Sequence, residues 1–314
     1  MSSLVIKGLS LSLLARIKQR MKKLKLYTHL HWVKFTWESI NDSQYMEWDI
    51  RRCYYSDPHP QPGKDEKVFY TDSELTHALD HDCAEKIAFI VESRYIAPHT
   101  YEFLENNIDV FDRVLTHNQD FIDQFPEKTT FYPHCNCLIK KVDFQLYNKT
   151  KLVSFISSEK QMNVSGHIMR HAIYNLYSKS NENWSRALLN DVRMDLYGSL
   201  ANNYVEYKLD SVKNYMFQVV VENSVIDTYF TEKIIDCFVT GTIPIYYGTK
   251  KINEFFNSNG IIHFSTLEEL FKILGGLTQE QYLSRMAAVK DNYQRAQNFI
   301  LAEDWLFENT DVFD

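Results

Sequence analysis

Short apolar runs recur along the first half of the chain, and segments with helical spacing separate them. The runs at 86–93, 111–117 and 129–134 alternate with helical segments at 98–106 and 120–125. This alternation is typical of a parallel sheet with helices on its faces. The proline-rich segment at 57–67 predicts an exposed loop ahead of these elements.

The alternation restarts in the second half. Strands are predicted at 151–157, 193–198, 215–222, 242–248 and 260–264, and helices at 166–178, from 231 to the break at 241, at 266–274 and at 279–300. A polar segment at 148–151 separates the two patterns. We therefore predict an α/β fold of two Rossmann-like domains, 1–149 and 150–314, with the last helix able to return to the first domain. Open α/β sheets bind ligands at the carboxyl ends of their strands, so we expect a cleft between the two domains.

Charge and cysteine content narrow the classes of function. The net charge of −7 argues against a nucleic-acid binder. Lys and Arg nevertheless crowd the first 25 residues beside Leu and Ile, which predicts a basic helix that either touches a membrane surface or is simply solvated. No apolar run reaches the roughly 20 residues that span a bilayer. The five cysteines show no paired CxxC spacing, and a cytoplasmic location fits best.

The helix predicted from 231 carries the first candidate chemistry. Thr231 can cap it, which leaves backbone N–H groups and the positive end of the dipole open to an anion. Glu232 and Lys233 point about 100° apart on a helix and need not pair with each other. Lys233 can then neutralise a diphosphate while Glu232 accepts hydrogen bonds from ribose hydroxyls. An acidic residue in a first turn is also ordinary helix chemistry, so the pattern alone leaves both interpretations open.

Longer motifs favour the first interpretation. The chain has neither G-x-G-x-x-G nor a P-loop motif. The stretch "VVVENSVIDTYFTEKIIDCFVTGTIPIYYG", residues 219–248, closely resembles the signature of the α1,3-fucosyltransferase family, glycosyltransferase family 10. The resemblance continues through "FFNSNGIIHFSTLEEL" and upstream through "SFISSEKQMNVSGHIMRHAIYNLY" and "MDLYG", over about 150–275. It is weak before residue 85. It implies a GT-B-like fold and a nucleotide-sugar donor, with GDP-fucose the best candidate.

The resemblance also implies roles for single residues. Arg170 matches the arginine that grips the donor diphosphate, and Lys233 the lysine that binds the pyrophosphate. Asn223 and Tyr229 match polar contacts around the phosphate and sugar, and Glu232 matches the ribose-binding carboxylate. We expect Arg170 and Lys233 to be exposed in the cleft. An arginine on an amphipathic helix would by itself be an ordinary surface residue.

The first domain is expected to hold the acceptor and to supply a base. Glu92 closes the apolar run at 86–93, where it would face the cleft, and it roughly matches the general-base glutamate of the family. His117 and His134, also at strand ends, are lesser candidates for the base. A strand-end carboxylate without any catalytic role is the alternative.

Asp80 and Asp82 form a D-x-D, a pattern with which other transferases hold a metal ion. We expect an ordinary charge pair there and no essential metal or other cofactor, because Arg170 and Lys233 already supply positive charge. The resemblance thus implies an inverting glycosyltransferase that transfers a sugar, with L-fucose from GDP-fucose the best candidate, to a hydroxyl of a glycan acceptor. A transferase of the same fold with another nucleotide sugar and a non-catalytic glycan-binding relative remain as alternatives.

Overall fold

The computed structural model describes residues 24–28, 43, 48–52, 61–134, 136–178 and 193–313. Residues 1–23, which hold most of the predicted basic helix, lie outside the described residues, so its membrane contact stays a prediction. Within the described ranges, none of the helices combines the length and the apolar character needed to cross a membrane.

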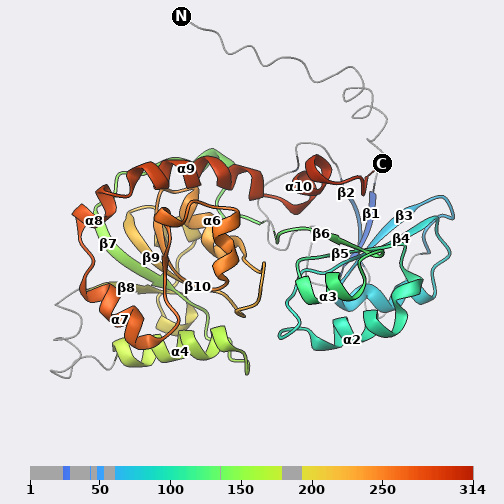
Figure 1. The fold of residues 1–314 in the computed structure, drawn as a ribbon, viewed down its shortest axis with the longest axis horizontal. Coiled ribbons are helices and arrows are strands. Elements are labelled where there is room, and N and C mark those ends of the chain that lie inside the picture. The colour runs from blue at the N-terminus through green and yellow to red at the C-terminus, as the bar shows by residue number, and fades with distance from the viewer. Residues whose placement is uncertain are drawn as a thin grey trace, which may run out of the picture.

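The first sheet is parallel throughout and has six strands. Its strands are β1 (Leu24–Thr28), β2 (Trp48–Arg52), β3 (Lys67–Thr71), β4 (Glu85–Phe89), β5 (Arg113–Thr116) and β6 (Thr129–Phe131), in the spatial order β2-β1-β3-β4-β5-β6. A 3₁₀ segment (Asp72–Leu79) follows β3. Helices α2 (Pro98–Asn107) and α3 (Gln119–Gln124) cover the same face of this sheet (Figure 1).

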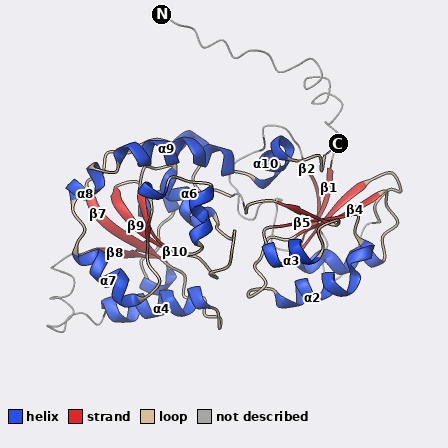
Figure 2. Cartoon of the chain, viewed as in Figure 1, coloured by secondary structure: helices blue, strands red, loops and turns tan. Residues whose placement is uncertain are grey.

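The second sheet is also parallel and has five strands. These are β7 (Lys151–Ile156), β8 (Met194–Tyr197), β9 (Tyr215–Val221), β10 (Ile243–Tyr247) and β11 (Ile262–His263), in the order β11-β10-β9-β7-β8. Helices α4 (Ser165–Ser178) and α7 (Leu267–Gly275) lie on one face, and α6 (Glu232–Phe238) and α9 (Met286–Ala296) on the other (Figure 2). The short helix α8 (Gln279–Leu283) precedes α9.

In each sheet, the strand order reverses beside the strand that comes first in the chain. The chain moves from β7 outward to β8, returns to pair β9 with the other side of β7, and then continues through β10 to β11. In the first sheet the chain likewise moves from β1 outward to β2 and then returns to pair β3 with the other side of β1. In doubly wound sheets a ligand binds beyond the carboxyl ends of the strands at this switch point. The second sheet therefore has its expected ligand position above β7 and β9.

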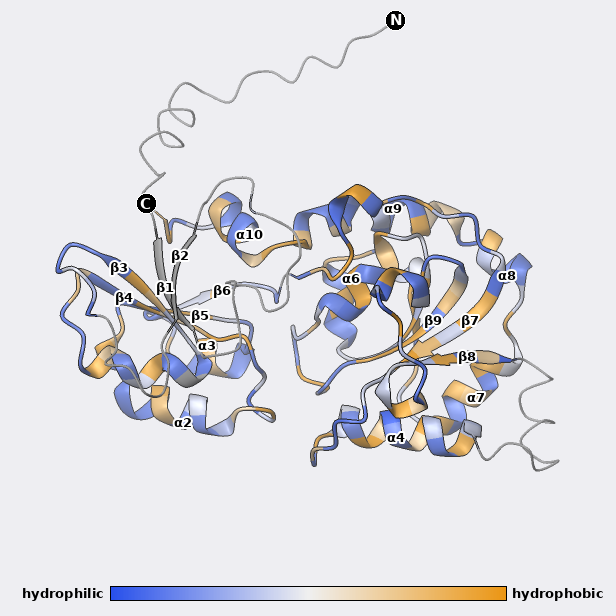
Figure 3. Ribbon diagram, turned by 180° about the vertical axis from the view of Figure 1, so that it is seen from behind, coloured by the Kyte–Doolittle hydropathy of each residue, from blue (hydrophilic) through white to orange (hydrophobic). Residues whose placement is uncertain are grey.

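The central strand β9 explains why the second sheet is stable. All seven of its residues, YMFQVVV, are buried, because helices cover both faces of a parallel sheet. The strands β7 and β9 are largely hydrophobic in colour, between helices that carry blue outer positions (Figure 3). Ile173 of α4 and Leu270 of α7 pack into the same cluster on one face.

The end of the chain lies against the first sheet. Helix α10 (Ala302–Asn309) follows α9, and Leu301 just before it forms a bridge with Asn136. The Lys67 ammonium donates to the carbonyl of Val312 at 2.8 Å. One apolar cluster joins the first sheet, α6 and this terminal segment; it includes Phe89, Leu115, Phe238, Phe299 and Leu306.

The predicted boundary at 149–150 falls in the connection between β6 and β7. Lys149 is buried there, and its ammonium donates to the carbonyls of Lys213 (3.0 Å) and Thr240 (2.8 Å) and to Thr242 Oγ1 (2.7 Å). Burial lowers the pKa of this lysine to about 7. These bonds fix the connection to the carboxyl end of α6 and the start of β10.

Two element predictions were wrong in detail. The single helix predicted over 279–300 is two helices, because α8 ends at Leu283 and the chain turns at Arg285. The Arg285 guanidinium donates to the carbonyl of Asn259 at 2.6 Å. The strand predicted over 86–93 spans only Glu85–Phe89, so Glu92 lies in the loop beyond it. Strands β1 to β3 and helix α10 were not predicted.

Gly166 allows α4 to approach the end of β9. A Cβ at this position would lie 1.7 Å from the carbonyl oxygen of Glu222 and 2.7 Å from that of Asn223. Gly166→Ala is therefore expected to lower the free energy of unfolding by at least about 1–3 kcal/mol, the usual cost of overpacking. Urea titration of the variant beside Gly276→Ala checks this, because a Cβ on Gly276 would meet its nearest atom only at 3.6 Å. Equal urea midpoints for the Gly166 variant and the wild type would contradict the close-approach argument.

Candidate functional site

Arg170 binds the end of strand β9 at the switch point. Its Nη2 donates to the Val221 carbonyl (2.6 Å) and to Asn223 Oδ1 (2.7 Å), and its Nε reaches the same carbonyl at 3.2 Å. The side chain comes from α4, the helix that follows β7, so one residue links the two strands that flank the reversal. The prediction that Arg170 is exposed was wrong. It is 6% exposed, because two of its three guanidinium nitrogens satisfy the end of β9.

Glu222 is the first residue after β9, and its carboxylate lies at the start of α6. Its fully buried carboxylate accepts hydrogen bonds from Thr231 N (3.0 Å), Thr231 Oγ (2.7 Å) and the Tyr246 hydroxyl (3.4 Å). The predicted cap is confirmed, since Thr231 Oγ accepts from the Lys233 amide. However, the Glu222 carboxylate itself occupies part of the place at this helix start where a ligand anion was expected. Glu222 was not among the predicted site residues, although an acidic residue directly after a fully buried strand is an unusual signal.

Lys233 pairs with two carboxylates. Its ammonium lies 3.1 Å from Glu232 Oε1 and 3.7 Å from Glu222 Oε2, and it donates to Thr231 Oγ at 3.0 Å. Glu232 and Lys233 therefore do pair, and the same ammonium also reaches Glu222. The lysine side chain is 24% exposed, so it is the more accessible of the two predicted cations.

Glu232 has a second cationic neighbour. Lys208 Nζ lies 3.9 Å from Glu232 Oε1 and 2.6 Å from Asp236 Oδ2. Burial would raise the pKa of the Glu232 carboxyl, but Lys233 and Lys208 outweigh it and hold that pKa well below its usual range. Glu232 is therefore ionised at neutral pH and can only accept hydrogen bonds. Lys208 was also missed, because it is separated from Glu232 by a whole strand.

Glu92 lies within electrostatic reach of this group, although it belongs to the first domain. Burial raises the pKa of its carboxyl, Lys233 and Lys160 oppose the shift, and Glu232 adds to it. The neighbouring Ser93 hydroxyl contacts the Ser224 hydroxyl of the second domain at 3.0 Å. The two domains are thus in contact beside Glu92, the residue predicted as the base.

Tyr229 and two histidines form an aromatic group at the same junction. The buried Tyr229 ring lies 4.9 Å from the His117 ring and 6.2 Å from the His134 ring, centroid to centroid. Burial lowers the pKa of His117 to about 3 and that of His134 to about 4, so both imidazoles are neutral. Burial, together with Glu92 and Glu222, raises the Tyr229 pKa well above its ordinary value. Burial thus makes both imidazoles weaker bases and the Glu92 carboxylate a stronger one than each is in water.

The D-x-D pair lies at the other end of the first sheet. Asp80 and Asp82 are exposed and come before β4, whereas Glu92 follows it. Asp82 pairs with Lys64 at 2.8 Å on the surface. Among the described residues, no group of three or more His, Cys, Asp and Glu side chains is arranged to hold a metal ion. Of the five cysteines, the structure describes Cys83, Cys137 and Cys237, and these three form no disulfide with one another.

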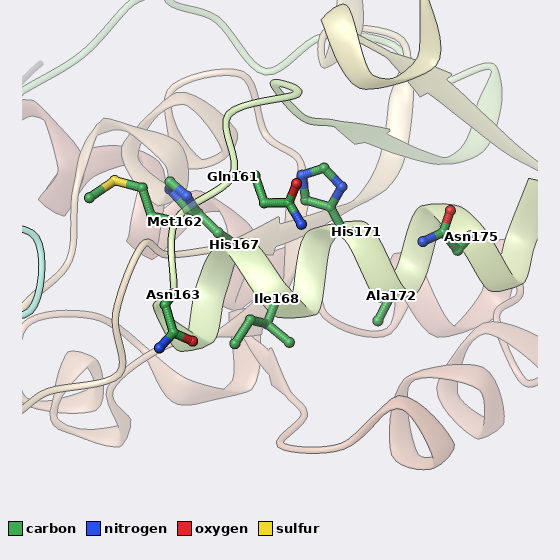
Figure 4. A pocket seen from close by; sticks show the side chains of 8 residues that line it. All are labelled: Gln161, Met162, Asn163, His167, Ile168, His171, Ala172 and Asn175. Carbon is green, nitrogen blue, oxygen red and sulfur yellow. The ribbon is translucent and has the colours of Figure 1, made fainter.

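A cavity of about 520 Å³ runs along α4 on the same domain. Figure 4 shows its lining, which consists of Gln161, Met162, Asn163, His167, Ile168, His171, Ala172 and Asn175. Burial, with help from Arg170, lowers the pKa of His167 to about 4. The lining contains amides, imidazoles and apolar groups but no Lys or Arg, so this cavity does not suit a diphosphate.

The chain resembles known glycosyltransferases in fold. An α1,3-fucosyltransferase structure aligns with 94% of this chain and 93% of its own, with a TM-score of 0.52 and 17% identity. The structure of TarM aligns with 80% of this chain and 55% of its own, with a TM-score of 0.50 and 12% identity. These likenesses confirm the predicted GT-B-like fold.

Sequence comparison adds curated relatives. The 4-galactosyl-N-acetylglucosaminide 3-alpha-L-fucosyltransferase 9 of Bos taurus is 26% identical over 172 residues, which are 52% of this chain and 42% of that protein. A putative fucosyltransferase-like protein of Arabidopsis thaliana is 31% identical over 84 residues, which are 26% of this chain and 16% of that protein. The chain thus spans less than half the length of these curated relatives.

The model of the C-terminal region of glycosyltransferase family 10 (fucosyltransferase) matches residues 147–305, just over half of the chain. This range contains Arg170, Asn223, Glu232 and Lys233, and it includes the whole stretch over which the motifs resembled this family. The chain therefore belongs to glycosyltransferase family 10, the fucosyltransferases.

Proposed function

We propose that this protein transfers L-fucose from GDP-fucose to a hydroxyl group of a glycan acceptor, with inversion at the anomeric carbon. One observation carries the proposal. Arg170, Glu232 and Lys233 gather beyond β7 and β9, and Glu92 of the first domain is within electrostatic reach of Lys233. Family membership supports sugar transfer. An α1,3-fucosyltransferase structure with GDP, which shares the fold at a TM-score of 0.50 and 18% identity, supports the choice of nucleotide.

The donor diphosphate would meet Lys233 and the remaining nitrogen of Arg170. Arg170 Nε and Nη2 are used by Val221 and Asn223, so Nη1 is the guanidinium nitrogen left to bind a phosphate oxygen. Ionised Glu232 would accept hydrogen bonds from ribose hydroxyls. Tyr229 stays neutral and would offer a hydroxyl near the sugar.

Glu92 would act as the base in a single displacement. Its carboxylate removes the acceptor hydroxyl proton while the acceptor oxygen bonds to the anomeric carbon and the bond from that carbon to the diphosphate breaks. The leaving GDP keeps the electron pair, and Arg170 and Lys233 stabilise its charge. A raised carboxyl pKa makes Glu92 a better proton acceptor.

The donor prediction concerns binding. Lys233→Ala should weaken GDP binding by about 10- to 100-fold, since a charge-assisted hydrogen bond contributes roughly 1.5–3 kcal/mol. Isothermal titration measures this. Lys213→Ala is the matched control, because Lys213 forms only a local pair with Asp210 within the same domain. Equal GDP affinity in the Lys233 variant and the wild type would exclude Lys233 from the donor site.

A panel of nucleotide sugars tests the choice of donor. GDP-fucose at 100 times its Kd should raise the free energy of unfolding by about 2.7 kcal/mol, and other nucleotide sugars at the same concentration should raise it less. Thermal shift assays report this difference. Stronger stabilisation by another nucleotide sugar would replace fucose with that sugar, and no stabilisation by any of them would favour the non-catalytic alternative.

The base prediction concerns turnover. Glu92→Gln should reduce kcat by about 10²- to 10⁴-fold and leave the GDP Kd almost unchanged, because the amide cannot take the proton. In the wild type, kcat/KM should fall as the pH drops through the Glu92 pKa, which lies above 4.5, because the base must be ionised. Near-normal turnover in the variant would move the base elsewhere, and His117 and His134 would be tested next.

Metal dependence is a separate test. We expect full activity in EDTA, because Arg170 and Lys233 supply the positive charge that the leaving diphosphate needs. Activity assays with and without added Mn²⁺ measure this. Activity that requires Mn²⁺ and is lost in Asp80→Ala or Asp82→Ala would contradict the metal-independent mechanism.

A further inference from the structure

Lys208 joins two carboxylates of α6 from outside the helix. It begins a 3₁₀ segment (Lys208–Ser211) before β9, and its side chain is only 16% exposed. Its ammonium contacts Asp236 Oδ2 at 2.6 Å and lies 3.9 Å from Glu232 Oε1. Burial alone would lower the pKa of this ammonium, but Asp236 and Glu232 outweigh it and raise that pKa, so the charge persists.

Donor binding would disturb the charge balance around Glu232. The Lys233 ammonium lies 3.1 Å from Glu232 Oε1 and 3.7 Å from Glu222 Oε2. A diphosphate that attracts Lys233 competes directly with both carboxylates. Removing the partner of a buried charge is strongly unfavourable, so each carboxylate needs another partner if the diphosphate is to bind well.

Glu222 already has such partners. Its oxygens accept hydrogen bonds from Thr231 N, Thr231 Oγ and the Tyr246 hydroxyl, and these bonds do not involve Lys233. Among the described residues, Lys208 is the second ammonium that pairs with Glu232, at 3.9 Å, and it also contributes to the low pKa of Glu232. The two carboxylates are thus compensated in different ways, one by hydrogen bonds and one by a second cation.

We propose that Lys208 is a positioning residue for the donor site: it keeps Glu232 ionised and in place when Lys233 turns toward the donor diphosphate. This inference rests on the proposed function, since it needs a nucleoside diphosphate at Lys233. Lys208 itself does not touch the donor. It acts through Glu232, and it lowers the electrostatic cost of releasing Lys233.

Lys208 also has a structural contact that the test must separate. Asp236 is fully buried and accepts hydrogen bonds from Leu138 N (2.8 Å) and from the Cys137 thiol (3.2 Å). Lys208→Met alone would leave Asp236 as a buried charge without a cation, which is by itself sufficient reason for that variant not to fold. Asp236→Asn removes this charge and leaves Lys208 beside Glu232.

The experiment compares three variants in GDP titrations, each with a melting temperature. Asp236→Asn should bind GDP about as tightly as the wild type. Adding Lys208→Met to Asp236→Asn should weaken GDP binding by about 10- to 100-fold, because Glu232 then competes with the diphosphate for Lys233. Adding Lys208→Arg to Asp236→Asn should restore most of the affinity, because the cation is back.

A purely structural role predicts a different pattern. The melting temperatures would then differ among the variants while the three GDP affinities stayed equal, and this result would overturn the proposal. Loss of affinity in the Lys208→Met double variant that Lys208→Arg does not restore would overturn it as well. If the wild type binds GDP but the variant with Asp236→Asn and Lys208→Met binds it equally well, only this inference fails. If the wild type binds no GDP, the proposed function fails and this inference fails with it.

Discussion

The buried carboxylate of Glu222 is the constraint on which the site depends. It stands at the carboxyl end of β9, the most buried strand of the second sheet, where an unpaired charge would be very costly. Its partners come from the first turn of α6 and from Tyr246 at the end of β10. The start of α6 is therefore held against the switch point of the sheet, and Lys233 is held over it. The same place joins Arg170 to Val221 and Asn223, so several functional side chains share one anchored edge.

The loop between β9 and α6 connects this edge of the second sheet to the first domain. Ser224 contacts Ser93, and the Thr228 hydroxyl donates to the carbonyl of His117. Thr228 has a φ of 63°, a left-handed conformation that costs a β-branched residue energy. The contact with His117 and the packing of Tyr229 on its ring hold the loop in this shape. Glu92, next to Ser93, is thus placed near Lys233 by contacts of neighbouring residues.

Much of this could be predicted from the sequence, because the signals are local. The apolar runs of β7, β9 and β10 form neighbouring strands of the second sheet, and Thr231 before Glu232 is a visible helix start. Arg170, Glu232 and Lys233 were found through a motif. The partners of these residues were not predictable in the same way. Glu222 meets Thr231, and Lys208 meets Asp236, only after the sheet has formed, and no spacing rule reports such contacts. The burial of Arg170 was misjudged for the same reason.

A crystal structure of the protein with GDP would test the central claim most directly, namely that the carboxyl edge of β7 and β9 is a diphosphate site formed around Glu222. We expect the diphosphate of GDP to lie at Arg170 Nη1 and Lys233 Nζ. We also expect that Glu222 keeps its bonds to Thr231 and that Lys208 stays beside Glu232. GDP bound elsewhere, or bound while Lys233 remains on Glu222 and Glu232, would contradict this claim.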